Sequence, residues 1–237
     1  MILVAVCVLV ISGCASIQST GSGPSTDHPP AGAQQSLIIT DVSDSALEGG
    51  HDDLGWQRTL TAVANAAPGD EVIVYLFRVN AGARCAPLQI QLAKQANPEE
   101  DAEFRRDLLG ALSDRYSRYQ ECVVTEPSGG GSAILGAIAE MHALFPRSRF
   151  IQVVTDGCSN RETSGTCRRQ QLNDPEFPGR FVDSLPPALC PALDGVRIVF
   201  VGLGRGTVLT PVELATLRAV YRSWGQRTGA AIEFQST

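Results

Sequence analysis

The stretch Leu37-Ile38-Ile39-Thr40-Asp41-Val42-Ser43-Asp44-Ser45 joins a short apolar run to a loop of carboxylate and hydroxyl side chains. Apolar runs of this length are typical of strands that are covered on both faces, as in a parallel sheet. In such sheets, ligands bind just beyond the carboxyl ends of the strands. This stretch therefore predicts a central buried strand and, directly after it, a loop that carries function.

Other segments of the chain are also predicted to form strands. Residues 72–79 are rich in β-branched and aromatic side chains, and the apolar runs 150–155 and 196–201 have the same character. Residues 231–234 are expected to form a last edge strand. Residues 122–124 are a possible short strand.

Helices are expected between these strands. Apolar residues recur at helical spacing from Trp56 to Ala67, and an acidic start followed by an apolar face predicts a helix from Glu99 to Tyr119. Ser132 is expected to be the N-cap of a helix that ends near Phe145. Thr210-Pro211-Val212-Glu213 combines a capping box with proline at the first helical position, so it predicts another helix start.

Alternating strands and helices indicate βαβ units. Residues 80–98 and 158–194 lack a clear period and are expected to be irregular. The sequence thus predicts one α/β domain over residues 37–237, with a doubly wound, mostly parallel, Rossmann-like sheet and helices on both faces.

Composition agrees with a folded domain and excludes several classes of protein. The 237 residues are 43% apolar and 19% charged, with a net charge of −6, which argues against a strongly basic surface for nucleic acid. Lys94 is the single lysine. The histidines His28, His51 and His142 have no spacing typical of metal ligands, and His51 is expected in a loop.

Three loops at the predicted carboxyl edge carry oxygen ligands. The first holds Asp41, Ser43 and Ser45, the second holds Ser132, and the third holds Asp156. Carboxylates and hydroxyls without histidine or thiol suit a hard cation such as Mg²⁺. We therefore expect a divalent-cation site, with Mn²⁺ or Ca²⁺ as alternatives to Mg²⁺.

Asp41-x-Ser43-x-Ser45 resembles the Asp-x-Ser-x-Ser signature of von Willebrand factor A domains. The glycine-rich loop before Ser132 and Thr155-Asp156-Gly157 follow in the order of that family. The resemblance covers about 200 residues and implies a metal-ion-dependent adhesion site. It implies that Ser43 and Ser45 bind the ion directly, that Asp41 and Asp156 act directly or through water, and that an acidic residue of a protein partner takes an open position.

One position departs from the family pattern, and other functions stay open. The second loop of the family usually supplies threonine, where this chain has Ser132; Thr125 is a less favoured substitute. An envelope assembly protein with a vestigial site is an alternative, because each motif alone is compatible with a turn. A metal-dependent hydrolase is a second alternative, but position 43 is serine, and no Gly-x-Ser-x-Gly motif is present. We expect no enzymatic activity.

The first residues predict export and a lipid anchor. Residues 2–11 are ten apolar residues, too few to span a bilayer but enough for a secretory signal. Ile11-Ser12-Gly13-Cys14 resembles the bacterial lipoprotein box, although the usual positively charged start is missing. This resemblance implies a signal peptide over residues 1–13, acylation of Cys14 and an extracytoplasmic, membrane-anchored protein, with residues 14–36 as a flexible tether.

Five cysteines remain after Cys7 and Cys14, so at most two disulfides form within the chain. Cys158–Cys167 is favoured because it closes a short polar loop, and Cys85–Cys122 is plausible. Pairing with Cys190 in place of Cys167 is also open. A disulfide directly after Asp156 is expected to shape the rim of the ion site.

Overall fold

The computed structural model describes residues 33–78, 85–95, 97–125, 132–160 and 165–236. The predicted signal peptide, the acylated Cys14 and most of the predicted tether lie outside these residues, as does the glycine-rich loop 129–131. Within the described residues, no helix is long and apolar enough to cross a membrane.

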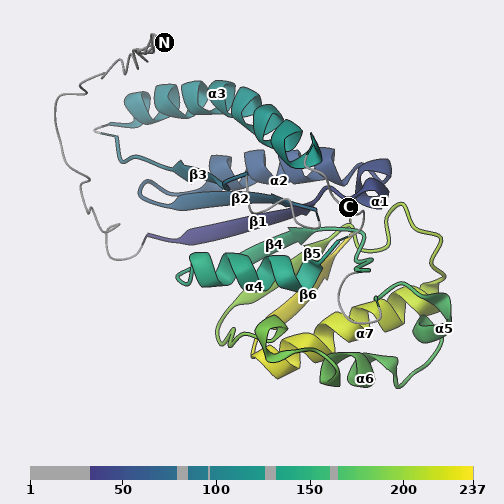
Figure 1. The fold of residues 1–237 in the computed structure, drawn as a ribbon. Helices are drawn as coiled ribbons and strands as arrows, with labels where there is room; N and C mark the ends of the chain where they lie inside the picture. Colours follow the sequence, from purple (N-terminus) through teal and green to yellow (C-terminus); the bar gives the residue numbers. More distant parts are fainter. Residues whose placement is uncertain (1–32, 79–84, 96, 126–131, 161–164, 237) are drawn as a thin grey trace, which may run out of the picture.

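The protein contains a six-stranded, mostly parallel sheet with helices on both faces (Figure 1), which confirms the predicted α/β architecture. The strand order is β3-β2-β1-β4-β5-β6, and only β3 runs antiparallel to its neighbour. The strands are β1 (Gln35–Asp41), β2 (Glu71–Phe77), β3 (Leu88–Gln91), β4 (Phe150–Val154), β5 (Arg197–Val201) and β6 (Ala231–Gln235).

The long helices α2 and α3 cover one face of the sheet, and α4 and α7 cover the other, with α6 packed on α7 (Figure 1). The helices are α1 (Asp44–Glu48), α2 (His51–Asn65), α3 (Pro98–Thr125), α4 (Ile134–Leu144), α5 (Arg169–Leu172), α6 (Phe177–Asp183), the short 3₁₀ helix η2 (Pro187–Leu189) and α7 (Pro211–Thr228).

The central strand β1 contributes to both cores because its side chains alternate between the two faces. Leu37 and Ile39 belong to the core under α4 and α7, whereas Ile38 belongs to the core under α2 and α3. All three side chains are at most 1% exposed. The strand is therefore fixed from both faces, and its carboxyl end has a fixed position.

The start of α7 matches its sequence signal. The Thr210 hydroxyl accepts a hydrogen bond from the Glu213 amide at 3.2 Å, and the Glu213 carboxylate accepts one from the Thr210 amide at 2.7 Å. The predicted capping box is confirmed. Gly229 ends the helix in a left-handed conformation, as its position predicts.

Several local predictions are wrong. Residues 122–124 are not a strand, because α3 continues to Thr125 and Val123 completes its buried face. Ser132 is not an N-cap; the N-cap position of α4 is Ala133, which makes no capping hydrogen bond with its side chain. The segment expected to be irregular at 158–194 holds α5, α6 and η2, and β3 lies within 80–98. Of these short elements, α5 and α6 pack against α7, η2 packs against α4, and β3 pairs with β2, so they depend on packing rather than on sequence period.

Candidate metal centre

Neighbouring parallel strands bring two aspartates to one edge of the sheet. Asp41 is the last residue of β1, and Asp156 follows β4 by two residues. The strands are in register, with Thr40 opposite Val154. Both aspartate side chains are fully buried. The two loops predicted to carry function therefore meet, as expected from the parallel sheet.

The Asp41 carboxylate joins these two loops directly. One of its oxygens accepts a hydrogen bond from the Ser43 amide at 2.9 Å, and the other accepts one from the Thr155 hydroxyl at 2.9 Å. The Thr155 hydroxyl also accepts a hydrogen bond from the Gly157 amide at 3.0 Å. Thr155 thus fixes the rotamer of Asp41 and the start of the next loop. This role was not predicted from the sequence, and the position of Thr155 next to Asp156 is the only sequence signal for it.

Two side-chain oxygens in the loops at this edge are among the buried atoms that have no hydrogen-bond partner in the described residues. They are Oδ2 of Asp156 and Oγ of Ser43. The other carboxylate oxygen of Asp156 accepts a hydrogen bond from the Cys158 amide at 2.7 Å. A buried polar atom without a partner costs about 1–3 kcal/mol. Two such oxygens, close to a second carboxylate, are the donor atoms that a bound cation would satisfy.

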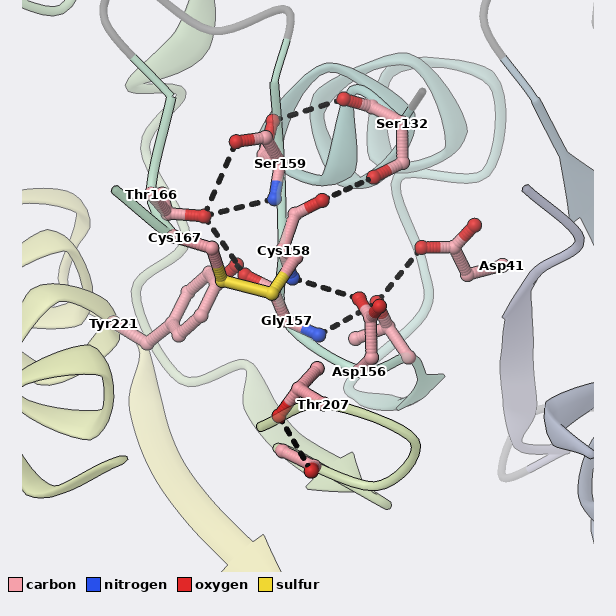
Figure 2. The surroundings of a disulfide bond; sticks show 12 residues. Asp41, Ser132, Asp156, Gly157, Cys158, Ser159, Thr166, Cys167, Thr207 and Tyr221 are labelled. Carbon is pink, nitrogen blue, oxygen red and sulfur yellow. Dashed lines mark hydrogen bonds between the residues drawn. A yellow bond between two sulfur atoms is a disulfide. The ribbon is translucent and has the colours of Figure 1, made fainter. Parts of the chain in front are cut away.

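Ser132 lies beside the third loop (Figure 2). Its hydroxyl donates a hydrogen bond to the Cys158 carbonyl at 2.9 Å, and its carbonyl accepts one from the Ser159 hydroxyl at 2.9 Å. A hydroxyl that donates one hydrogen bond keeps lone pairs that can bind a cation. The structure therefore brings Ser132 to the segment that follows Asp156.

The electrostatics of the two aspartates favour a positive charge between them. Burial raises the pKa of Asp41, and the negative charge of Asp156 raises it further, against the hydrogen bonds from the Ser43 amide and the Thr155 hydroxyl. Burial likewise raises the pKa of Asp156. This increase is partly offset by the Cys158 amide, by the nearby exposed Ser45 side chain and by His51. Two buried carboxylates, one of which raises the pKa of the other, are a suitable environment for a divalent cation.

The donor set at this edge consists of oxygen atoms. Its titratable members are Asp41 and Asp156, and no group of three or more His, Cys, Asp or Glu able to hold a metal is found in the described part of the chain. A cation here would be held by two carboxylates, serine hydroxyls and water. That combination fits Mg²⁺, which keeps several waters, better than it fits zinc.

A disulfide fixes the loop after Asp156 (Figure 2). Cys158 is bonded to Cys167. The hydroxyls of Thr166 and Tyr221 both donate to the Gly157 carbonyl at 2.8 Å. The carboxylate of Asp156 is thus carried by a segment with covalent and hydrogen-bonded support.

The favoured pairing, Cys158–Cys167, and the plausible one, Cys85–Cys122, are both confirmed. The second disulfide joins Cys85 to Cys122 on α3, and Cys190 is the free cysteine among the described residues. Disulfides persist in oxidising compartments, which indicates an extracytoplasmic location.

His51 was expected in a loop, and that prediction is wrong. It is the first residue of α2 and is fully buried. Its Nδ1 lies 2.9 Å from the Ala46 carbonyl, and its Nε2 lies 3.2 Å from the Gly202 carbonyl. His51 thus connects α1, which follows the Asp-x-Ser-x-Ser loop, to the loop after β5. Its sequence spacing carries no signal of this role.

Comparison with known proteins identifies no family for this chain. No protein-family model matches it, and no curated protein matches it.

Gly157→Ala is expected to destabilise the protein by about 2–4 kcal/mol. Gly157 has φ +84°, and an added Cβ would lie 2.4 Å from Cδ1 of Leu203. Urea unfolding measures the change. Gly110→Ala is the control, because Gly110 lies in α3 with no atom near the added methyl, and this change is expected to stabilise by about 0.5–1 kcal/mol. Equal effects of the two substitutions would contradict the strained position of Gly157.

Ion-free protein is expected to lose stability, relative to its Asp41→Asn variant, as the pH rises above the ordinary aspartate value of about 3.9. The pKa of Asp41 is raised in the folded state, so its contribution is fully present below the unfolded pKa and is lost as the pH rises through the folded pKa. Urea unfolding of both proteins in chelator, over a pH series, measures this difference. A difference that is constant with pH would contradict the raised pKa.

Proposed function

We propose that this chain is an extracytoplasmic, lipid-anchored domain resembling the von Willebrand factor A family, which binds a divalent cation and, through it, a protein partner. Mg²⁺ is the expected ion, with Mn²⁺ or Ca²⁺ as substitutes. The observation that carries the proposal is the pair of unpartnered buried oxygens, Asp156 Oδ2 and Ser43 Oγ, beside the second buried carboxylate of Asp41.

The proposed ligands come from three loops: Asp41, Ser43, Ser45, Ser132 and Asp156. A bound ion would supply positive charge and an open coordination position for an acidic side chain of the partner. The ordered surroundings support this role, since Thr155 holds Asp41 and the Cys158–Cys167 disulfide holds the segment after Asp156. Prearranged ligands lose little conformational entropy when the ion binds.

The proposed anchor is an acylated Cys14, which lies outside the described residues. Two or three acyl chains would give durable attachment to the membrane. The two disulfides support the proposed side of that membrane. The net charge of −6 supports a protein partner rather than nucleic acid.

Affinity capture from an envelope extract of the source cells tests the partner. A specific protein is expected to be retained in Mg²⁺ and released by excess chelator, and Asp41→Ala is expected to retain none. Asp53→Asn, which removes an exposed carboxylate from α2, is the matched control and should bind as the unchanged protein does. Full retention in excess chelator would contradict an ion-bridged complex.

A further inference from the structure

The opposite edge of the sheet, where the parallel strands begin, has a cleft. The cavity has a volume of about 570 Å³ and is open to solvent. Its lining comes from the chain just before β1, from the starts of β1, β4 and β5, and from the turn before β4: Ala33, Gln34, Gln35, Arg147, Arg149, Phe150 and Arg197. Three of these seven residues are arginines, in a chain whose net charge is −6.

The arginines keep much of their positive charge available to solvent. Arg147 is 59% exposed, and its contact with Glu71 is a long 4.0 Å. Arg149 is exposed and donates to the Asp194 carbonyl at 3.3 Å; in the described part of the chain, no carboxylate forms an ion pair with it. Because a carbonyl does not neutralise a guanidinium, Arg149 retains its full charge.

Arg197 makes the shortest described hydrogen bonds of the three. Its guanidinium forms two hydrogen bonds of 2.7 Å with Glu233 and lies 5.3 Å from the centre of the Phe150 ring. Glu233 offsets the charge of Arg197, so Arg147 and Arg149 supply most of the attraction for an anion. Planar guanidinium groups match phosphate geometry well.

The predicted tether enters the described part of the fold at this cleft. Ala33 and Gln34 line the cavity, and the residues before Ala33 lead to Cys14. Nineteen residue steps separate Cys14 from Ala33, which limits the reach to about 65 Å when fully extended. The edge with the arginines is thus the edge at which the chain from Cys14 enters the domain. The aspartates lie at the other end of β1, about 20 Å away by strand rise.

We propose that the cleft formed by Arg147, Arg149 and Arg197 binds the phosphate groups of anionic phospholipids in the membrane that carries the anchor. This inference rests on the anchored location in the proposed function, but not on the ion site. Contact at this edge orients the domain so that the edge with Asp41 and Asp156 faces away from the membrane, toward a partner.

Vesicle co-sedimentation tests the proposal without acyl chains. The protein is residues 14–237 with Cys14→Ser, since every described contact lies within residues 33–236. It is expected to bind phosphatidylcholine vesicles that contain about one-third phosphatidylglycerol and not to bind vesicles of pure phosphatidylcholine. The bound protein is expected to dissociate at high salt. Arg147→Gln/Arg149→Gln is expected to weaken binding roughly 25-fold, since each arginine near an anionic surface contributes about fivefold.

Arg115→Gln/Arg118→Gln is the matched control, because it removes the same charge from the exposed side of α3 and should change binding less than about twofold. Equal loss in the two double variants would overturn the proposal, as would equal binding to both vesicle types. Displacement from vesicles by inorganic phosphate, where chloride at the same ionic strength has no effect, would also overturn it in favour of a small-anion site. Mg²⁺ calorimetry on the same samples reports on the ion site separately, so failure of one proposal is distinguishable from failure of the other.

Discussion

Asp41→Asn is expected to abolish the stabilisation of this protein by Mg²⁺. The asparagine carbonyl can still accept one hydrogen bond from the Ser43 amide or the Thr155 hydroxyl, but the charge that attracts the cation is lost. At a Mg²⁺ concentration 100 times the dissociation constant, a ligand specific to the folded state adds about 2.7 kcal/mol, or roughly 5–10 °C in the melting temperature of a domain of this size.

Thermal unfolding with Mg²⁺ and with chelator measures this shift. The unchanged protein should show the full shift, Asp53→Asn should match it, and Asp41→Asn should show none. Asp41→Asn also removes a carboxylate whose pKa is raised by burial, so it should be at least as stable as the unchanged protein in chelator at neutral pH. A Mg²⁺ shift that persists in Asp41→Asn would contradict the proposed ligand set. The absence of any shift in the unchanged protein would favour a vestigial site.

Removing each disulfide separately is expected to affect the free energy of unfolding and the Mg²⁺ affinity in opposite orders. The Cys85–Cys122 bond closes a sequence separation of 37 residues, so its loss by Cys85→Ser/Cys122→Ser should cost about 4 kcal/mol on the chain-entropy estimate. The Cys158–Cys167 bond closes a separation of only 9, so its loss should cost about 2.5 kcal/mol. Urea unfolding in chelator gives both values.

Mg²⁺ affinity should change in the opposite order. Cys158→Ser/Cys167→Ser frees the segment that follows Asp156 and should weaken Mg²⁺ at least about tenfold, as loss of support around a metal ligand does. The Cys85–Cys122 bond makes no contact with the proposed ligands through any described hydrogen bond, so its removal should change affinity less than about threefold. Each double variant thus serves as the control for the other. Equal losses of affinity would contradict the role given to the disulfide beside Asp156.

The sequence predicted the parts of the fold whose signals are local and strong. Buried runs such as 150–154 and the capping box at Thr210 depend on side-chain period and on hydrogen bonds within one turn, so they are visible without tertiary structure. Residues 122–124 illustrate the limit of that approach. A β-branched pair at the end of a helix looks like a strand, although Val123 lies one helical turn beyond the buried Tyr119.

The positions of the two acidic residues of the candidate site could be predicted from the sequence. The contacts that support them could not. Asp41 and Asp156 each follow a buried strand, and parallel strands must bring such positions to one edge. The hydrogen bond between Thr155 and Asp41 and the contact between His51 and Gly202 each join residues more than 100 positions apart in sequence. No local pattern in the sequence encodes such contacts.

A titration with Mn²⁺ tests the central claim most directly, because this paramagnetic ion broadens the NMR signals of nearby amides. Broadening is expected first at the amides of Ser43, Gly157 and Cys158, which surround the two aspartates, and excess Mg²⁺ should reverse it. The amides of Gln35 and Arg197, at the other edge of the sheet, should stay sharp. Broadening that spares the first group, or that begins at the arginine edge, would contradict a divalent-cation site at Asp41 and Asp156.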